Sequence, residues 1–491
     1  MPIHVPPVPN TAPDATAFAA VRRIFDSAGF TEAAICERLS LSQLAEVEAA
    51  VVRAKDSGPL RNASDALTRL FVEGWPVKRN DLEAVLAAES IQHLQDFTLL
   101  EPRGDDSLAA TVSLYPIEHL FIVSDRYNNA DGSPFEIWDD FVYPCLFITT
   151  RKFIETLPRQ ATGDVLDLCA GTGVGAMLIA GQSKHIVGAD LTKRCGIFME
   201  FNAKLNGFDN FETAIGDLYA PVAGRQFDTI IVHPPYQPVL EHIATFNSGG
   251  ADGEHITRRI ITEAPKYLKP GGRLYCLCQL TDRDHPAELR IRNWLSDADN
   301  AEVDVAFVVY KHHDIGRYTA IETLQERKPH AAWQSWMEAL TTNGVKDMVY
   351  GTVVLQKSAS PLRSTFTARR EGPSATVEDL MALLDAETRA TAWDFGASIE
   401  NRKIRALPGS TMRVVHKPGD GKWETEKLEL VRESPFKVLL QIDPVTANLL
   451  PQMDGTRTCG ELRQSLPFAV PPEQFGSLVR MLMSHRVVVL E

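Results

Sequence analysis

The chain has 491 residues, of which 44% are hydrophobic and 23% are charged, an ordinary composition for a globular protein. A chain of this length divides into roughly three domains and can bury a sizeable core. The formal net charge of -14 at pH 7 disfavours general binding to nucleic acid, while leaving room for a local basic patch.

The cysteines and the N-terminus indicate a cellular location. The 7 cysteines are scattered and odd in number, which is typical of reduced thiols rather than of a disulfide framework. The N-terminus has neither the basic region nor the apolar stretch of a secretory signal, and no apolar run approaches membrane-spanning length. We therefore expect a cytoplasmic protein without a membrane partner.

The first part of the chain is expected to be a flexible arm over residues 1–15, followed by a small module over residues 16–115. Helical patterns come first, and two apolar stretches around a polar turn then predict a hairpin. This layout indicates a winged-helix-like module, which can bind DNA or dock another protein. Because the first helices are rich in acids, docking or lid-like packing is favoured. The expected helices are Ala17–Ala28, Thr31–Leu39, Ser42–Ala54, Ala63–Glu73 and Arg79–Leu86, and the expected strands are Phe97–Pro102 and Ala109–Leu114.

The central part, residues 116–357, begins with a connector and continues with apolar strands that alternate with amphipathic helical segments. Such alternation predicts an α/β domain with a mostly parallel sheet and helices on both faces. The expected strands are Val165–Leu168, Ile186–Asp190, Phe211–Ile215, Thr229–Val232, Arg273–Leu280, Val303–Tyr310 and Gly351–Gln356. The expected helices are Gly175–Gly181, Cys195–Asn206, Ile256–Leu268 and Ala287–Ser296.

The last part begins with residues 358–376, which are rich in serine, threonine and arginine and are expected to form a linker. Residues 377–491 are expected to form a second winged-helix-like module with hairpins. Its expected helices are Val377–Asp385, Thr446–Leu450, Glu461–Leu466 and Glu473–Ser484, with a turn over Asp454–Thr456 and a terminal strand over Arg486–Leu490.

A glycine-containing turn follows the first strand of the central part, in Asp167-Leu168-Cys169-Ala170-Gly171-Thr172-Gly173. Glycine allows a tight turn and a close approach of backbone N–H groups to a ligand, and the next helix adds a partial positive charge. The dinucleotide fingerprint would need a third glycine where Ala176 stands. Asp167 would repel a pyrophosphate, but it can accept hydrogen bonds from the ammonium group of S-adenosylmethionine (SAM).

Two more acids follow at successive strand ends. Asp190 ends the second strand, where a carboxylate can accept hydrogen bonds from both ribose hydroxyls. Asp217 ends the third strand region, where it can face the edge of an adenine. One such acid alone is more often a turn residue, but three in one cleft indicate that they bind a cofactor together.

His233-Pro234-Pro235-Tyr236 ends the fourth strand. The two prolines fix φ and lack N–H groups, so the neighbouring carbonyls are free and rigidly aimed. Those carbonyls can accept a hydrogen bond from an amine or amide and orient its lone pair toward a methyl group. Tyr236 can stack on a planar substrate or face a sulfonium cation. The alternative is a stiff loop without a chemical role.

These stretches resemble class I SAM-dependent methyltransferases. Within that class the chain resembles the small-domain group with an Asn/Asp-Pro-Pro-Tyr/Phe loop, which includes release-factor glutamine, ribosomal RNA guanine and adenine N-methyltransferases. The resemblance covers about residues 140–357 and extends to the glycines of Gly249–Gly253 and to Lys269–Leu274. It implies a Rossmann-like, seven-stranded methyltransferase domain, here flanked by the two winged-helix-like modules.

The resemblance also implies roles for the motif residues. Asp167, Gly171 and Gly173 would hold the methionine part of SAM, Asp190 the ribose and Asp217 the adenine. The candidate cofactor-binding residues are Asp167, Cys169, Ala170, Gly171, Thr172, Gly173, Asp190, Leu191, Asp217, Leu218 and Tyr143. The candidate catalytic residues are His233, Pro234, Pro235 and Tyr236, and no metal ligand is expected.

His233 departs from the family pattern, which has Asn, Asp or Ser at this position. A neutral imidazole does not reproduce the geometry of an amide, but it can take up a proton near neutral pH. We therefore expect methylation of a nitrogen of a small molecule or a peptide or protein, with a small amine, carboxylate or phenol also plausible. The alternatives are methylation of an RNA or DNA base and a SAM-binding protein that recognises a partner without turnover.

Two weaker candidates lie outside these motifs. Tyr310–Asp314 follows the sixth strand, where a solvated loop or a substrate wall is favoured over a metal pair, because neighbours on an extended chain point apart. Tyr143 and Thr149–Arg151 precede the sheet and could form a lid over the cofactor.

Overall fold

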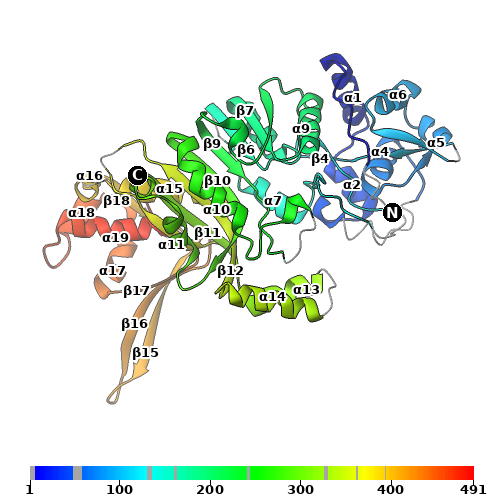
Figure 1. Cartoon of the computed structure of the whole chain (residues 1–491). Helices are drawn as coiled ribbons and strands as arrows, with labels where there is room; N and C mark the ends of the chain where they lie inside the picture. Colours follow the sequence, from blue (N-terminus) through cyan, green and yellow to red (C-terminus); the bar gives the residue numbers. More distant parts are fainter. Residues whose placement is uncertain are drawn as a thin grey trace. The chain divides into compact units, whose positions relative to one another are not determined.

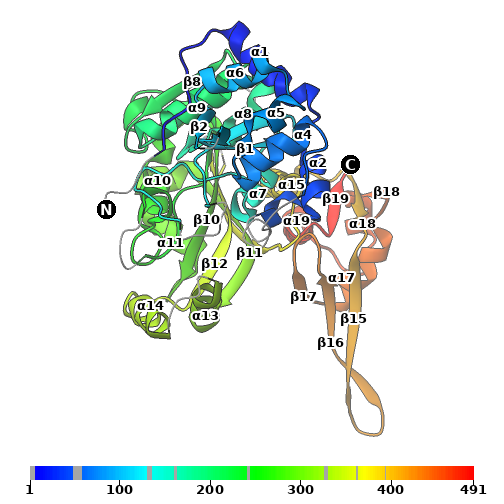
Figure 2. The same cartoon turned by 90° about the vertical axis from the view of Figure 1, so that its right-hand side faces the viewer.

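The computed structural model describes residues 6–47, 58–104, 106–129, 135–159, 163–239, 244–325, 330–360, 363–392 and 394–491. The chain divides into two compact units, Met1–Lys269 with Leu274–Leu277, and Pro270–Arg273 with Cys278–Glu491. Figures 1 and 2 show the course of the chain from two sides. Strand β10 (Leu268–Asp282) contributes residues to both units.

The core of the first unit is a parallel sheet in which β9, β6, β7 and β8 are neighbours in that order. These strands span Phe227–Val232, Gly163–Leu168, Ser183–Asp190 and Phe211–Ile215. Their central residues, such as Leu166, Val187 and Ile230, are buried, as is usual for strands covered on both faces. Because the strands are parallel, their carboxyl ends meet at one edge, where ligands bind in open α/β sheets.

Four helices of the first unit contribute to the region around this edge. They are α7 (Ile148–Glu155), α8 (Val174–Ile179), α9 (Lys193–Leu205) and α10 (His255–Tyr267). Helix α9 packs against β7 and β8 and also joins the sheet to strand β5 (Leu120–Ser124). Asn202 of α9 makes two hydrogen bonds with the backbone of Val123, of 2.8 and 3.0 Å. A buried ion pair between Arg194 and Asp125 adds to this joint.

The N-terminal part contains helices followed by a small sheet of order β1-β3-β2. Its helices are α1 (Ala15–Ser27), α2 (Glu32–Leu39), η1 (Leu44–Glu46), α4 (Ala63–Leu67), the π-helical η2 (Thr68–Glu73), α5 (Arg79–Glu83) and α6 (Ala88–Asp96). Its strands are β1 (Val77–Lys78), β2 (Leu100–Arg103) and β3 (Ser107–Ala110). The predicted hairpin is confirmed, because β2 and β3 pair antiparallel.

Two expectations for this part need adjustment. The helix predicted over Ser42–Ala54 is represented by η1, and residues 48–54 of that range lie outside the described residues. The strand predicted over Ala109–Leu114 is divided between β3 and a further strand, β4 (Ser113–Ile117), which pairs with β5. The sequence of Ala109–Leu114 contains no glycine or proline that would mark this break between the two strands.

The described part of the expected arm is bonded to the rest of the first unit. The backbone N–H of Asn10 donates to the carbonyl of Phe97 at 3.0 Å, and the Asn10 side chain donates to the carbonyl of Asp96 at 3.0 Å. The Arg194 guanidinium donates to the carbonyl of Pro6 at 3.1 Å. Residues 6–14 are therefore held in place, and residues 1–5 lie outside the described residues.

The second unit contains the strands β11 (Val303–Asp314), β12 (Asp347–Lys357) and β13 (Thr367–Glu371). Strand β11 pairs antiparallel with β12 and parallel with β13. Over the described residues the strand order is β13-β11-β12-β10-β9-β6-β7-β8, so the sheet has 8 strands, which are the seven expected within residues 116–357 and one more, β13. The additional strand β13 lies within the expected linker 358–376, and its polar residues show no apolar alternation.

Tyr310–Asp314 is strand and not the expected solvated loop. Strand β11 continues to Asp314, where His313 pairs with Met348 and Asp314 with Asp347. The side chains of Lys311–Asp314 are all polar, so the sequence gives no apolar pattern that would predict a strand there. Helices α11 (Ala287–Trp294), α12 (Asp297–Glu302), α13 (Ile315–Gln325) and α14 (His330–Thr342) belong to the same unit, and only the first of them was predicted.

The C-terminal part has its own buried core, to which Ile404, Phe475 and Leu482 contribute. The predicted turn at Asp454–Thr456 is wrong, because these residues form strand β18, which pairs with β14. The helices are α15 (Val377–Ala390), α16 (Phe395–Ser398), α17 (Pro444–Leu449), η6 (Leu450–Gln452), α18 (Cys459–Gln464) and α19 (Pro472–Ser484). The strands are β14 (Lys403–Ala406), β15 (Ser410–Pro418), β16 (Trp423–Arg432), β17 (Val438–Ile442), β18 (Asp454–Thr458) and β19 (Val488–Leu490).

All seven cysteines carry free thiols. Within the described part of the chain, no helix combines the length and the apolar character needed to cross a membrane.

Candidate active site

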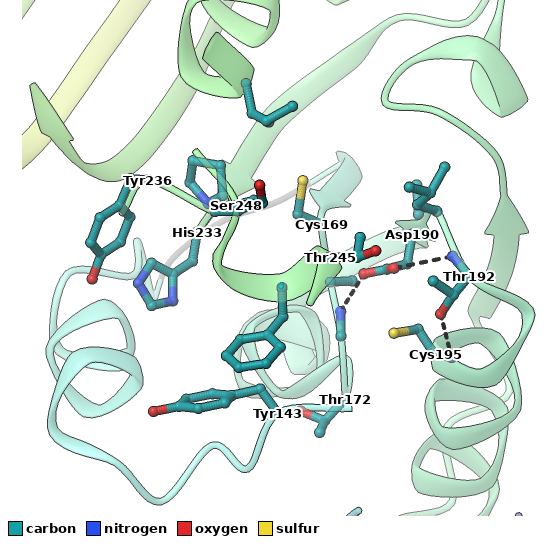
Figure 3. Close-up of a pocket in the computed structure, with 18 of the residues that line it drawn as sticks. Tyr143, Cys169, Thr172, Asp190, Thr192, Cys195, His233, Tyr236, Thr245 and Ser248 are labelled. Atoms are coloured by element: carbon teal, nitrogen blue, oxygen red, sulfur yellow. Dashed lines mark hydrogen bonds between the residues drawn. The ribbon is translucent and has the colours of Figure 1, made fainter. Parts of the chain in front are cut away.

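A cavity of about 520 Å³ lies in the first unit at the carboxyl ends of β6, β7 and β9 (Figure 3). This volume is within the usual range for small-molecule and cofactor sites. The cavity brings together every candidate site residue from the sequence analysis except Gly173. The candidates that line it are Tyr143, Asp167, Cys169, Ala170, Gly171, Thr172, Asp190, Leu191, Asp217, Leu218, His233, Pro234, Pro235 and Tyr236.

The glycine loop turns through left-handed backbone conformations. Gly171 has φ of 55° and Gly173 has φ of 77°, while Cys169 adopts φ of 57° without being glycine. A non-glycine residue in this region costs free energy and is often found at binding sites. A Cβ atom on Gly173 would lie 3.0 Å from Met177 and 3.2 Å from Met199. Gly173 is therefore required for the turn and for packing, and it does not face the cavity.

Asp167 is the most deeply buried acid of the cavity, with 2% of its surface exposed. Its Oδ2 accepts a hydrogen bond of 2.9 Å from the backbone N–H of Ala176, and no described residue forms an ion pair with it. Burial raises the pKa of Asp167 to about 7. A positively charged ligand group at this carboxylate would offset the cost of burying its charge.

Asp190 connects the end of β7 to the glycine loop. Its Oδ2 accepts a hydrogen bond of 2.9 Å from the backbone N–H of Gly171, and its Oδ1 lies 3.4 Å from the backbone nitrogen of Thr192 (Figure 3). Burial also raises the pKa of Asp190. Thr192 then caps α9 by accepting a hydrogen bond of 3.1 Å from the N–H of Cys195. The chain itself therefore fixes the position of the Asp190 carboxylate.

Asp217 differs from the other two acids, because its side chain is 54% exposed. It lines the cavity, but its Oδ2 also accepts a hydrogen bond of 2.6 Å from Arg259 on α10. The next residue, Leu218, has φ of 48°, a second left-handed non-glycine residue at the cavity. The acid predicted to face adenine is thus partly neutralised by a neighbouring arginine.

The Pro-Pro-Tyr segment rests on the glycine-rich stretch Gly249–Gly253. The N–H of Gly249 donates to the carbonyl of Gln237 at 3.0 Å, and the N–H of Val239 donates to the carbonyl of Gly250 at 3.0 Å. A Cβ atom on Gly253 would lie 2.4 Å from the carbonyl oxygen of Tyr236, at a backbone φ of 80°. The stretch thus lacks side chains where two backbone segments approach each other closely.

His233 has a buried Nε2 atom without a hydrogen-bond partner in the described residues. Its ring stacks on Phe153, with centroids 5.2 Å apart and planes at 18°, and lies 5.6 Å from the ring of Tyr236. Burial lowers the pKa of His233 to about 4. The expectation that His233 takes up a proton near neutral pH is therefore wrong, because the apolar rings around it disfavour the cation.

Several further residues, which were not predicted from the sequence, line the same cavity. Among them are Asp139 and Asp140, which lie in the connector, and Thr245 and Phe246, which follow the Pro-Pro-Tyr segment. The ring of Phe246 stacks on Tyr143 with centroids 4.8 Å apart. The hydroxyl of Thr245 donates to Asp139 at 3.1 Å. The signal that could have found Asp139 and Asp140 is a pair of acids inside an aromatic stretch.

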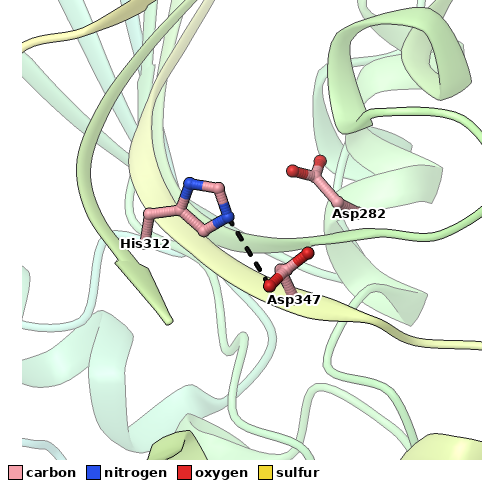
Figure 4. Close-up of side chains that lie close together, drawn as sticks. All are labelled: Asp282, His312 and Asp347. Atoms are coloured by element: carbon pink, nitrogen blue, oxygen red, sulfur yellow. Dashed lines mark ion pairs between the residues drawn. The ribbon is translucent and has the colours of Figure 1, made fainter. Parts of the chain in front are cut away.

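A second group of polar side chains lies in the second unit (Figure 4). Atoms of Asp282, His312 and Asp347 that could bind a metal lie within 4.8 Å of one another, and His312 is 3.7 Å from Asp347. However, both Asp282 oxygens accept hydrogen bonds from Arg369, at 2.8 and 2.9 Å. The charge of Asp282 is thus already balanced, and the group is an ion-pair network.

Comparison with known proteins shows what this part of the chain is similar to. Residues 146–311 match the family model described as the methyltransferase small domain. The match confirms the resemblance predicted from the sequence.

Three curated relatives show how far the similarity extends. The chain is 38% identical over 116 residues to a putative protein N5-glutamine methyltransferase of Methanocaldococcus jannaschii, covering 22% of this chain and 58% of the relative. It is 33% identical over 162 residues to the ribosomal protein uL3 glutamine methyltransferase of Bradyrhizobium diazoefficiens, covering 29% and 50%. It is 30% identical over 136 residues to the ribosomal RNA small subunit methyltransferase C of Alcanivorax borkumensis, covering 28% and 36%. The chain therefore spans less than two thirds of each relative.

Proposed function

We propose that this chain, whose residues 146–311 match the model of the methyltransferase small domain, transfers a methyl group from SAM to a nitrogen of a protein or peptide. The observation that carries the proposal is a single cavity that holds the buried acids Asp167 and Asp190 together with the segment His233–Tyr236. The names of two relatives support a protein nitrogen as the acceptor, because both refer to glutamine.

The residues of the cavity fit SAM. Asp167 is a buried carboxylate without an ion-pair partner among the described residues, which suits the ammonium group of the methionine part. Asp190 is a carboxylate at the end of β7 that lines the cavity, and its Oδ1 lies 3.4 Å from the backbone nitrogen of Thr192, which suits the ribose hydroxyls. Asp217, half-exposed beside Arg259, suits the adenine edge. When bound, SAM would supply the electrophilic methyl group.

The other residues of the cavity would position the acceptor. Methyl transfer is a direct displacement, and most of the acceleration comes from holding the acceptor lone pair close to the methyl carbon and in line with it. Pro234 and Pro235 stiffen the segment whose carbonyls can accept an N–H of the acceptor. The neutral His233 offers Nε2 as a further hydrogen-bonding atom, and its packing on Phe153 excludes water.

The experiment that tests the proposal has a binding step and a turnover step. Calorimetric titration with SAM should show binding to the wild type and binding about 100-fold weaker to Asp190→Ala, because a buried charged hydrogen-bond acceptor contributes about 2 to 3 kcal/mol. Asp209→Asn is the matched control, since Asp209 is exposed and does not line the cavity. Equal SAM binding by the wild type and Asp190→Ala would contradict the assignment. Mass spectrometry of cell-extract proteins incubated with labelled SAM should then identify a methylated nitrogen.

RNA is the second candidate acceptor, because one relative is a ribosomal RNA methyltransferase. We also propose that residues 16–115 form a winged-helix-like module, supported by the sheet order β1-β3-β2, and that residues 377–491 form another, supported by the order β18-β14-β19. An RNA-binding role predicts affinity for mixed oligonucleotides that falls steeply with salt. Absent or salt-insensitive binding would count against it, as the net charge of -14 does already.

If the chain instead binds SAM and recognises a partner without turnover, the calorimetric titration should give the same result, but no labelled product should form.

We also propose a cytoplasmic location, which the seven free thiols support.

A further inference from the structure

The cavity has more carboxyl groups than the proposed SAM site uses. Among the described residues that line it, five are aspartates, and none is lysine or arginine. Asp167, Asp190 and Asp217 are already assigned to the cofactor, which leaves Asp139 and Asp140. Asp139 accepts a hydrogen bond from Thr245, while Asp140 forms no hydrogen bond or ion pair with any described residue. The Asp140 carboxylate is therefore available to a ligand.

Aromatic rings line the same cavity. Figure 3 shows Tyr143, His233 and Tyr236 on one side and Asp190, Thr192 and Cys195 on the other. Phe246 stacks on Tyr143 and also lies 5.6 Å from the ring of Phe141, which directly follows Asp140. The faces of aromatic rings carry partial negative charge and attract cations. The lining of the cavity is thus both acidic and aromatic.

The hydrogen-bonding group on this side is neutral. The Nε2 atom of His233 is buried and has no partner in the described residues, and the ring packs between Phe153 and Tyr236. A neutral imidazole can accept one hydrogen bond from an N–H through the nitrogen that carries no proton. It adds no positive charge that would repel a cationic ligand. By contrast, the side-chain amide of Asn offers a donor and an acceptor together, which suits a carboxamide.

We propose that the acceptor of this site is a primary ammonium group on a flexible chain, held by Asp140 and the rings of Tyr143 and Tyr236, with His233 accepting one N–H. The inference rests on the proposed methyltransferase function and names the chemical class of its substrate. The shared chemistry is an alkylammonium, which a lysine side chain or a free diamine can supply.

The reaction balances without another reagent. The ammonium group first releases one proton to solvent and becomes a neutral amine. Its lone pair forms the new bond to the methyl carbon while the bond between that carbon and sulfur breaks, and the electron pair of the broken bond stays on sulfur. The positive charge passes from sulfur to nitrogen, so the products are a methylammonium group and a neutral thioether. Asp140 stabilises the cation before and after transfer.

The test measures binding of matched probes to the full chain saturated with S-adenosylhomocysteine. The probes are three short peptides that differ only in a central lysine, acetyl-lysine or glutamine, together with 1,4-diaminobutane. We expect the lysine peptide or the diamine to bind at least about ten times more tightly than the glutamine and acetyl-lysine peptides, a difference typical of a partly desolvated ion pair with aromatic contacts. Which of the two cations binds more tightly distinguishes a peptide side chain from a free amine.

Two variants locate the preference. Asp140→Asn should weaken cation binding about fivefold and leave the glutamine peptide unchanged, because a half-exposed ion pair contributes modestly. Asp209→Asn removes an equal charge at an exposed position that does not line the cavity. It should change neither the binding of the cations nor the binding of the glutamine peptide. Glutamine binding as tightly as lysine would overturn the proposal, and so would an equal effect of both variants. Each titration is repeated without S-adenosylhomocysteine, so that a failure to bind the nucleoside, which contradicts the proposed function, is measured separately from a missing cation preference.

Discussion

The two ends of the cavity are built in different ways. At the cofactor end, Asp167 and Asp190 are held by the backbone N–H groups of Ala176 and Gly171. At the acceptor end, the Nε2 atom of His233 is buried without a partner in the described residues. Leaving such an atom without a hydrogen bond costs about 1 to 3 kcal/mol, which a ligand can recover.

This difference shows where specificity can change. The cofactor end is organised by contacts within a local strand–turn–helix unit, so its geometry does not depend on the acceptor. The acceptor end is assembled from the segment His233–Tyr236, the stretch Gly249–Gly253 and the connector around Asp140. Changes at that end should alter turnover and acceptor choice while leaving SAM binding intact.

The largest expected effect comes from Gly253→Ala. The new Cβ atom would lie 2.4 Å from the carbonyl oxygen of Tyr236, and the alanine would have to adopt the backbone φ of 80° that Gly253 has. The Pro-Pro-Tyr segment must therefore move. A displacement of about 1 Å can lower a rate about 100-fold, because transfer depends on alignment. We expect a loss of that size in the initial rate of methyl transfer, with SAM affinity by calorimetry within about twofold of the wild type.

Gly224→Ala is the control for Gly253→Ala. Gly224 has the same φ of 80°, but no heavy atom lies within 4 Å of the position that a Cβ atom would take there. It therefore introduces the same backbone strain without the contact. If both variants lose activity equally, backbone strain explains the loss and the contact with Tyr236 does not.

A second prediction concerns the pH dependence of SAM binding. Burial raises the pKa of Asp167 from 3.8 to about 7, so the protonated acid favours the folded state at low pH and this contribution is lost as pH rises through 7. The ammonium group of SAM prefers the carboxylate, so binding should release a proton. We expect SAM affinity to rise about tenfold for each pH unit below the pKa of Asp167.

Calorimetry in buffers of different ionisation enthalpy counts the protons released on SAM binding. The neutral variant Asp167→Asn should bind SAM more weakly, with an affinity that is independent of pH over this range. An unchanged pH dependence in that variant would assign the proton to another group, of which the buried Asp190 is the nearest candidate, since burial raises its pKa as well.

The sequence predicted which residues line the cavity at the ends of β6 and β7, because the signals for them are local. A strand, a glycine turn and an acid at the next strand end occur within a short stretch, and the structure places Gly171 and Asp190 in contact. Gly173 is the exception, since its glycine is required by packing on Met177 and Met199 and not by the cavity. A motif alone does not separate these two causes.

The acceptor end could not be predicted in the same way. Asp140 and His233 lie far apart in the sequence, and only the folded chain brings them to one cavity. The neutral state of His233 depends on its packing against Phe153, which no spacing reveals. Strand β13 was missed for a related reason, since it is held by pairing with β11 and shows no apolar alternation of its own.

The smallest expected effect is on SAM affinity, and it comes from changing the exposed acid Asp217 instead of a buried one. Asp217 is 54% exposed and paired with Arg259, and an exposed ion pair contributes about 0 to 1 kcal/mol. Asp217→Asn should therefore weaken SAM binding only about twofold to threefold, far less than Asp190→Ala. Arg259→Gln is the matched change on the other partner and should leave SAM affinity unchanged or slightly higher, because it frees the carboxylate. If Asp217→Asn weakens binding as much as Asp190→Ala, burial does not determine which acid holds the cofactor, and the adenine contact dominates the affinity.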